Sequence, residues 1–220
     1  MAHPVLVAEL DRWNGFHLST LPNPTSEIVG RGEPLRSLDD WKGRRVRILG
    51  PAAESMRARG AVTVGMPATE LYTAVERGVA DAAAFPMSSH KSYRIFEVAK
   101  WYTHGLSIAH TFAGIMINKD AFARLPAEYQ QMLRDYPEDG GYAKSIVNHE
   151  KADKEALETF RQAGLEEIDI TPALHAEFRE RAAKPAWAKW VQDMDKAGYE
   201  GQKLLDTLLA HAEEHKDAKF

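Results

Sequence analysis

Short apolar runs alternate with helical patterns between Ser37 and Pro86, and this is the clearest pattern in the chain. Apolar and β-branched residues gather into three runs typical of strands, over 44–49, 62–66 and 79–85. Residues with helical spacing separate these runs, over 52–59 and 69–77. A strand–helix–strand–helix–strand order requires crossover connections, so it predicts an α/β protein with a mainly parallel sheet covered by helices.

The spacing also predicts elements toward both ends of the chain. Before the central stretch we expect a helix over 4–12 and two short strands, over 16–21 and 27–30. After it we expect a helix over 87–100, a long strand over 107–118, a helix over 142–162, a strand over 165–170, and helices that start near 172 and 199. A proline and paired glycines between Tyr136 and Gly141 separate the helix over 142–162 from the one before it.

Composition excludes several classes of protein. The chain has 220 residues with a net charge of −4, and its basic residues are scattered, so we expect no nucleic-acid partner. No run approaches the roughly 18 apolar residues of a membrane helix. Cysteine is absent, which excludes disulfides, thiolate metal sites and a cysteine nucleophile. The histidines form no ligand motif with metal spacing, so we predict no metal and no cofactor.

Two residues near strand ends are candidates for ligand binding. Arg47 lies near the end of the first predicted strand and Phe85 at the end of the third. Ligands of such sheets sit beyond the carboxyl ends of the strands, and a guanidinium can hold a carboxylate through two parallel hydrogen bonds. The alternatives are that Arg47 pairs with an acid on the surface and that Phe85 packs in the core. The chain has no nucleophile elbow of the GxSxG type, so we predict no catalytic residue and no enzyme.

Two segments carry a resemblance to a known family. They are Asp40–Arg47, with the sequence DWKGRRVR, and Pro67–Asp81, with the sequence PATELYTAVERGVAD. This order resembles the solute-binding (DctP-type) subunits of TRAP transporters, which carry DLKGxKIRV followed by PxxExYxALxxGxxDG. The resemblance continues through Tyr93–Trp101 and Ile115–Lys119 and covers the chain from Ala8 onward.

The resemblance implies a two-lobed fold like that of periplasmic binding proteins. Residues 1–34 would be a remnant of the first lobe and a crossing segment, and 35–107 the βαβ second lobe. Residues 108–220 would supply a returning strand and helices shared between the lobes. The start at Met1 lacks the pattern of a signal peptide, and family members have a further βαβ portion before this point. We therefore expect a chain that lacks its N-terminal third, with an incomplete first lobe.

The resemblance also implies a function: capture of a small organic acid in the periplasm and its delivery to a TRAP membrane permease. Arg47 would hold the solute's carboxylate. Phe85 stands where sialic-acid-binding members place an asparagine, which favours a smaller and less hydroxylated acid. His110 and Phe112, on the returning strand, are further candidates for solute contact, although alternation does not say which face they take.

The sequence leaves open the match to a second binding residue of the family and two alternative functions. A second arginine of the sialic-acid binders has no clear match; Glu27 lies near that position, and Arg31 is a possible substitute. The chain could instead be a small enzyme that binds acids with Arg47 and uses His110 as a base. A solute-sensing module on the same fold is the other alternative.

Overall fold

The computed structural model describes residues 4–50, 52–110, 112–136 and 142–214. The chain forms two compact units, Met1–Pro24 with His110–Asp153 and Thr25–Ala109 with Lys154–Phe220. The predicted lobe over 35–107 lies inside the second unit, which also includes the residues on either side of it; the finer division stays a prediction. Within the described residues, no helix is both long and apolar enough to cross a membrane.

The first unit is built on a two-stranded antiparallel sheet. Strand β1 (Gly15–Pro22) pairs with β7 (Phe112–Asn118), from Gly15 opposite Asn118 to Pro22 opposite Phe112. The helices of this unit are α1 (Pro4–Arg12), α5 (Lys119–Ala123), α6 (Ala127–Asp135) and the first part of α7 (Tyr142–Gln162). Phe16 of β1 meets Phe122 of α5 edge to face, with ring centroids 5.0 Å apart, so α5 packs on the sheet.

The second unit contains a six-stranded sheet in the order β4-β3-β5-β2-β6-β8. Its strands are β2 (Ser26–Gly30), β3 (Arg45–Arg47), β4 (Val62–Val64), β5 (Ala82–Pro86), β6 (Trp101–His104) and β8 (Glu166–Asp169). The β4–β3, β3–β5 and β6–β8 pairs are parallel, whereas β2 runs antiparallel to both β5 and β6. The predicted α/β class with a mainly parallel sheet is therefore confirmed.

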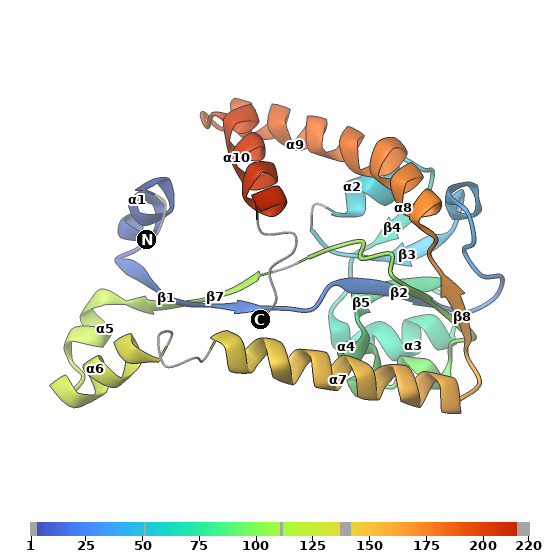
Figure 1. Ribbon diagram of the computed structural model, residues 1–220, viewed down its shortest axis with the longest axis horizontal. Coiled ribbons are helices and arrows are strands. Elements are labelled where there is room, and N and C mark those ends of the chain that lie inside the picture. The colour runs from blue at the N-terminus through green and yellow to red at the C-terminus, as the bar shows by residue number, and fades with distance from the viewer. Residues whose placement is uncertain (1–3, 51, 111, 137–141, 215–220) are drawn as a thin grey trace. The chain divides into compact units, whose positions relative to one another are not determined.

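Helices cover both faces of this sheet (Figure 1). Helices α3 (Leu71–Glu76) and α4 (Met87–Ser92) and the end of α7 lie on one face, and α2 (Ala52–Arg57), α8 (Pro172–Phe178) and α9 (Lys184–Lys196) on the other. Helix α10 (Gly201–Glu214) packs on α9. Alternate strand residues enter two separate apolar clusters, for example Ala82 with α2 and α8, and Ala83 with α3 and α7.

The chain between residues 87 and 118 differs from the prediction. Helix α4 ends at Ser92, because Arg94 takes a left-handed conformation with a φ of +57° and the chain then forms a short 3₁₀ turn over Ile95–Glu97. Strand β6 follows at once, where the sequence pattern predicted none. Strand β7 begins only at Phe112, and before it Ala109 forms an isolated bridge with Ser26.

Candidate functional site

Arg47 and Phe85 lie at the same edge of the six-stranded sheet. Arg47 is the last residue of β3, and it stands opposite Ala83 of the parallel strand β5. Phe85 lies two residues further along β5, just before that strand ends. Because β3 and β5 run in the same direction, both side chains project at the carboxyl ends of their strands, as the sequence predicted.

The Arg47 side chain is buried, with 3 % of its surface exposed, yet its hydrogen-bonding partner is a neutral group. Its Nε and one terminal nitrogen, Nη2, donate to the carbonyl oxygen of Met66, over 3.3 Å and 3.1 Å. Among the residues that the structure describes, no carboxylate forms an ion pair with this guanidinium, and its other terminal nitrogen, Nη1, donates to none of them. Arg47 is therefore not a surface ion pair.

Burial makes the positive charge of Arg47 less favourable. Loss of solvent lowers the pKa of the guanidinium below its usual value, while the phenol of Tyr93 is close enough to act in the opposite direction. An arginine keeps its proton even so, because its ordinary pKa is far above neutral pH. A buried charge without a counter-ion is costly, so this position favours an anion that completes the pair.

The guanidinium lies over the ring of Phe85, which belongs to an aromatic group. The Phe85 ring centroid lies 4.9 Å from the Arg47 Cζ, and Phe85 stacks on Tyr93 at 5.8 Å with an angle of 30° between the rings. His90 meets Phe85 edge to face, with centroids 6.0 Å apart. Phe85 also packs against the apolar cluster under α3 and α4, so it is part of the core as well as a neighbour of Arg47.

His90 is a fixed, neutral member of this group. Its side chain is fully buried, and burial, with a smaller effect from Arg47, lowers its pKa to about 3. Its Nε2 lies 3.2 Å from the carbonyl oxygen of Glu27, which can only accept, so Nε2 carries the proton. Since the ring is enclosed, His90 supports Phe85 from within the core.

Glu27 and Arg31, the two candidates for a second polar contact, both have structural partners. The buried carboxylate of Glu27 accepts hydrogen bonds from the Thr103 hydroxyl at 2.7 Å and from the backbone amides of residues 105, 106 and 107. Burial raises the pKa of Glu27, and these hydrogen bonds oppose the rise. Arg31 donates to the carbonyls of Val75 and Glu76 at the end of α3, over 2.8 Å and 2.7 Å. Its contacts are those of a helix cap.

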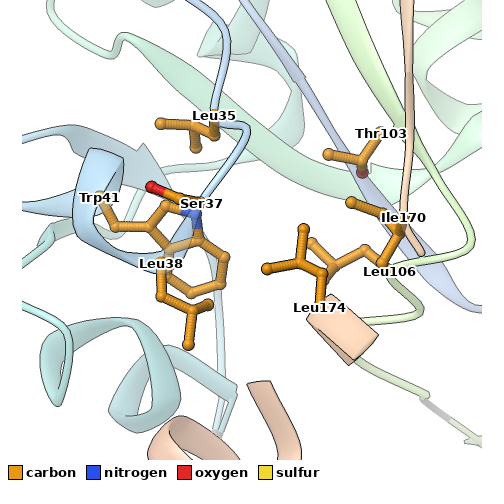
Figure 2. Close-up of a pocket in the computed structure, with 8 residues that line it drawn as sticks. All are labelled: Leu35, Ser37, Leu38, Trp41, Thr103, Leu106, Ile170 and Leu174. Atoms are coloured by element: carbon orange, nitrogen blue, oxygen red, sulfur yellow. The ribbon is translucent and has the colours of Figure 1, made fainter. Parts of the chain in front are cut away.

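The same unit also contains an apolar recess. Figure 2 shows Leu35, Leu38 and Trp41 on one side of a recess and Leu106, Ile170 and Leu174 on the other. Its polar lining residues are Ser37 and Thr103, and the Thr103 hydroxyl already donates to Glu27. This recess offers no cation to a carboxylate. In the described parts of the chain, no group of three His, Cys, Asp or Glu residues could hold a metal ion.

The family model for bacterial extracellular solute-binding proteins, family 7 (DctP), matches residues 6–193. The chain belongs to this family. The curated relatives include a solute-binding protein of Albidiferax ferrireducens, 30% identical over 166 residues, which are 73% of this chain and 48% of that protein. The ectoine-binding periplasmic protein TeaA of Halomonas elongata is 28% identical over 212 residues, which are 94% of this chain and 59% of that protein. The chain thus spans about half the length of these relatives.

Solved structures of family members have the same fold. A TRAP periplasmic solute-binding protein from Rhodoferax ferrireducens with bound malonate superposes with a TM-score of 0.81 at 25% identity, and the match covers 97% of this chain and 67% of that one. The resemblance to the TRAP solute-binding family and to its fold is therefore confirmed.

The other two predicted site residues of this DctP family member lie in the first unit. His110 is exposed at the start of that unit's second segment. Phe112 begins β7, and its side chain lies outside the described residues. Their part in solute contact stays a prediction. Tyr93 and His90, by contrast, lie beside Phe85 but were not predicted as site residues; both fell inside the helix predicted over 87–100, and Tyr93 was aromatic.

Proposed function

We propose that this chain binds a small organic acid through the carboxylate and that Arg47 is the anchor. The observation that carries the proposal is the buried guanidinium of Arg47, which has a neutral carbonyl as its hydrogen-bonding partner among the described residues. A carboxylate at this position would supply the missing negative charge, and the pair would gain strength because little water reaches it.

The hydrogen-bonding geometry of Arg47 supports two contacts with a carboxylate. The Met66 carbonyl occupies the side of the guanidinium that carries Nε and Nη2. The outer edge, formed by Nη1 and the second hydrogen of Nη2, is left for the solute. That edge presents two parallel N–H groups, which match the two oxygens of a carboxylate.

The residues placed around Arg47 support binding rather than catalysis. His90 is enclosed and uncharged, Phe85 is apolar, and the Met66 carbonyl is already engaged. None of these described neighbours pairs a nucleophile with a base in hydrogen-bonding reach, which covalent catalysis would require. A solute held here would be released unchanged.

Membership of the DctP family supports the wider role. We propose that the protein works in the periplasm as the solute receptor of a TRAP-type transporter and that it delivers its acid to the membrane permease. The malonate bound by the Rhodoferax relative supports a carboxylic acid as solute. The aromatic wall at Phe85 supports an acid with few hydroxyl groups.

Calorimetric titration of the chain with paired ligands tests this proposal. The panel contains malonate, pyruvate, lactate, benzoate and galacturonate, and each acid is matched with its uncharged amide. We expect at least one acid to bind and its amide to bind about ten- to a hundredfold more weakly, because the amide loses the charge-assisted hydrogen bonds. If no acid binds, or if the amides bind as well as the acids, carboxylate capture is not the function.

A further inference from the structure

Tyr93 is held beside the Arg47 site by its backbone and its ring. It follows the last residue of α4, and its backbone amide donates to the carbonyl of Ser89 over 3.0 Å. The next residue, Arg94, turns the chain with a positive φ of +57°, so the helix cannot continue. The Tyr93 ring then stacks on Phe85. The position of the ring is fixed on two sides, by the helix end and by the stack.

The Tyr93 hydroxyl, in contrast, is not engaged by the described residues. The residue is 38% exposed, and its phenol forms no hydrogen bond with any residue that the structure describes. Tyr102 shows the usual arrangement, since it is buried and its hydroxyl donates to Glu167 over 2.6 Å. Tyr93 therefore combines a fixed ring with an available polar group.

Tyr93 and Arg47 share a neighbour. Both lie against the Phe85 ring, at 5.8 Å and 4.9 Å from its centroid, and the phenol is close enough to act electrostatically on the guanidinium. His90 is enclosed and the Met66 carbonyl is engaged, whereas Tyr93 is partly exposed and its hydroxyl has no hydrogen-bonding partner among the described residues, so this hydroxyl is available to a solute.

We propose that Tyr93 is a second solute-binding residue, whose hydroxyl forms a hydrogen bond with an oxygen substituent of the acid held at Arg47. This inference rests on the proposed function and narrows its solute class. A phenol can donate to an oxo group or a second carboxylate, and it can accept from a hydroxyl. The preferred solutes are then 2-oxo, 2-hydroxy or short dicarboxylic acids rather than acids with a plain hydrocarbon body.

The test compares three-carbon acids that differ only in the substituent on carbon 2, which is an oxo group, a hydroxyl group or hydrogen. Pyruvate, lactate and propionate are titrated into the parent chain, into Tyr93→Phe and into Tyr199→Phe. The Phe variant keeps the ring that stacks on Phe85 and removes the hydroxyl alone. Tyr199 is a matched control, because it is 39% exposed in the same unit and lies next to α10 instead of α4.

We expect the parent to bind pyruvate or lactate more tightly than propionate. In Tyr93→Phe, affinity for the preferred oxygenated acid should fall about three- to tenfold, the usual effect of one neutral hydrogen bond. Affinity for propionate and the melting temperature without ligand should stay the same. Tyr199→Phe should change neither affinity.

Two kinds of result would overturn the inference, and they are distinguishable. The acids could bind while Tyr93→Phe leaves the ratios of their dissociation constants unchanged, or weakens the binding of all three equally and lowers the melting temperature. Either result would show that Tyr93 does not contact the oxygen on carbon 2, while carboxylate capture would stand. If the parent prefers propionate, the narrowed solute class is wrong. If no carboxylate binds the parent at all, the proposed function and this inference fail together.

Discussion

The guanidinium carbon of Arg47 lies 4.9 Å from the centroid of the Phe85 ring. An interaction of this kind contributes about 0.5–2 kcal/mol and fixes the orientation of the cation, but it does not cancel the charge. Phe85 can therefore hold Arg47 in place while the outer edge of the guanidinium stays available for an anion. The two side chains have separate tasks, and separate substitutions should reveal them.

Replacement of Arg47 by lysine should weaken binding of carboxylates without abolishing the positive charge. Lysine keeps the charge but loses the planar edge that supplies two parallel hydrogen bonds. The loss of hydrogen bonds to a charged group costs about 1.5–3 kcal/mol, which corresponds to about a ten- to hundredfold rise in Kd. Calorimetric titration with the best acid of the panel measures this change.

Arg45→Lys is the matched control for that experiment. Arg45 lies on the same strand, but its guanidinium is partly exposed and pairs with Asp81 over 2.6 Å. A surface ion pair contributes little, so this variant should bind acids like the parent. Equal affinity of Arg47→Lys and the parent for the best acid would show that Arg47 is not the anchor.

Substitution of Phe85 should change the preference among acids more than it changes overall affinity. Phe85→Asn replaces an apolar wall with an amide but removes neither Arg47 nor the Met66 carbonyl that it donates to, so hydroxylated acids such as galacturonate should gain relative to benzoate. Phe85→Leu is the control, because it shortens the wall but keeps it apolar. The ratio of the two dissociation constants is the measurement; a ratio that is the same in parent and Phe85→Asn would exclude Phe85 from the solute-binding wall.

The sequence was informative wherever the signal was local. The apolar runs and helical spacing between Ser37 and Pro86 predicted the βαβ series, because the strands there are short apolar runs and the helices between them have helical spacing of apolar residues. The meeting of Arg47 and Phe85 followed from that series, since parallel neighbours bring their carboxyl ends to one edge. Helix α7 was predicted with its observed bounds, because its pattern is long and periodic.

The sequence was uninformative where position depends on distant partners. In the strand Trp101–His104 the first three residues are buried in a row and His104 is exposed, so the strand has no alternation to recognise. The place of Tyr93 depends on the left-handed conformation of Arg94, and arginine does not signal such a turn. Glu27 could not be assigned either, because the loop amides that surround it lie far along the chain, at residues 105–107.

Glu167 gives the protein a pH-dependent part of its stability. Burial acts to raise the pKa of this carboxyl, but hydrogen bonds from Tyr102, His104 and Arg161 outweigh it and hold the pKa at about 2. The folded chain therefore binds the proton less tightly than the unfolded chain, whose carboxyl has a pKa near its ordinary value of 4.5. The resulting stabilisation is present above about pH 4.5 and is lost as the pH falls toward 2.

Glu167→Gln should accordingly lower the free energy of unfolding by about 2–3 kcal/mol at pH 7, and the difference from the parent should shrink between pH 4.5 and pH 3. Urea unfolding of both chains at several pH values measures it. Glu166→Gln is the matched control, because Glu166 is the adjacent residue of β8, half-exposed, and its partner among the described residues is Arg36 in a surface ion pair. If the difference in free energy of unfolding between the parent and Glu167→Gln stays constant down to pH 3, the charge of this carboxylate does not hold the end of α7 to β6 and β8.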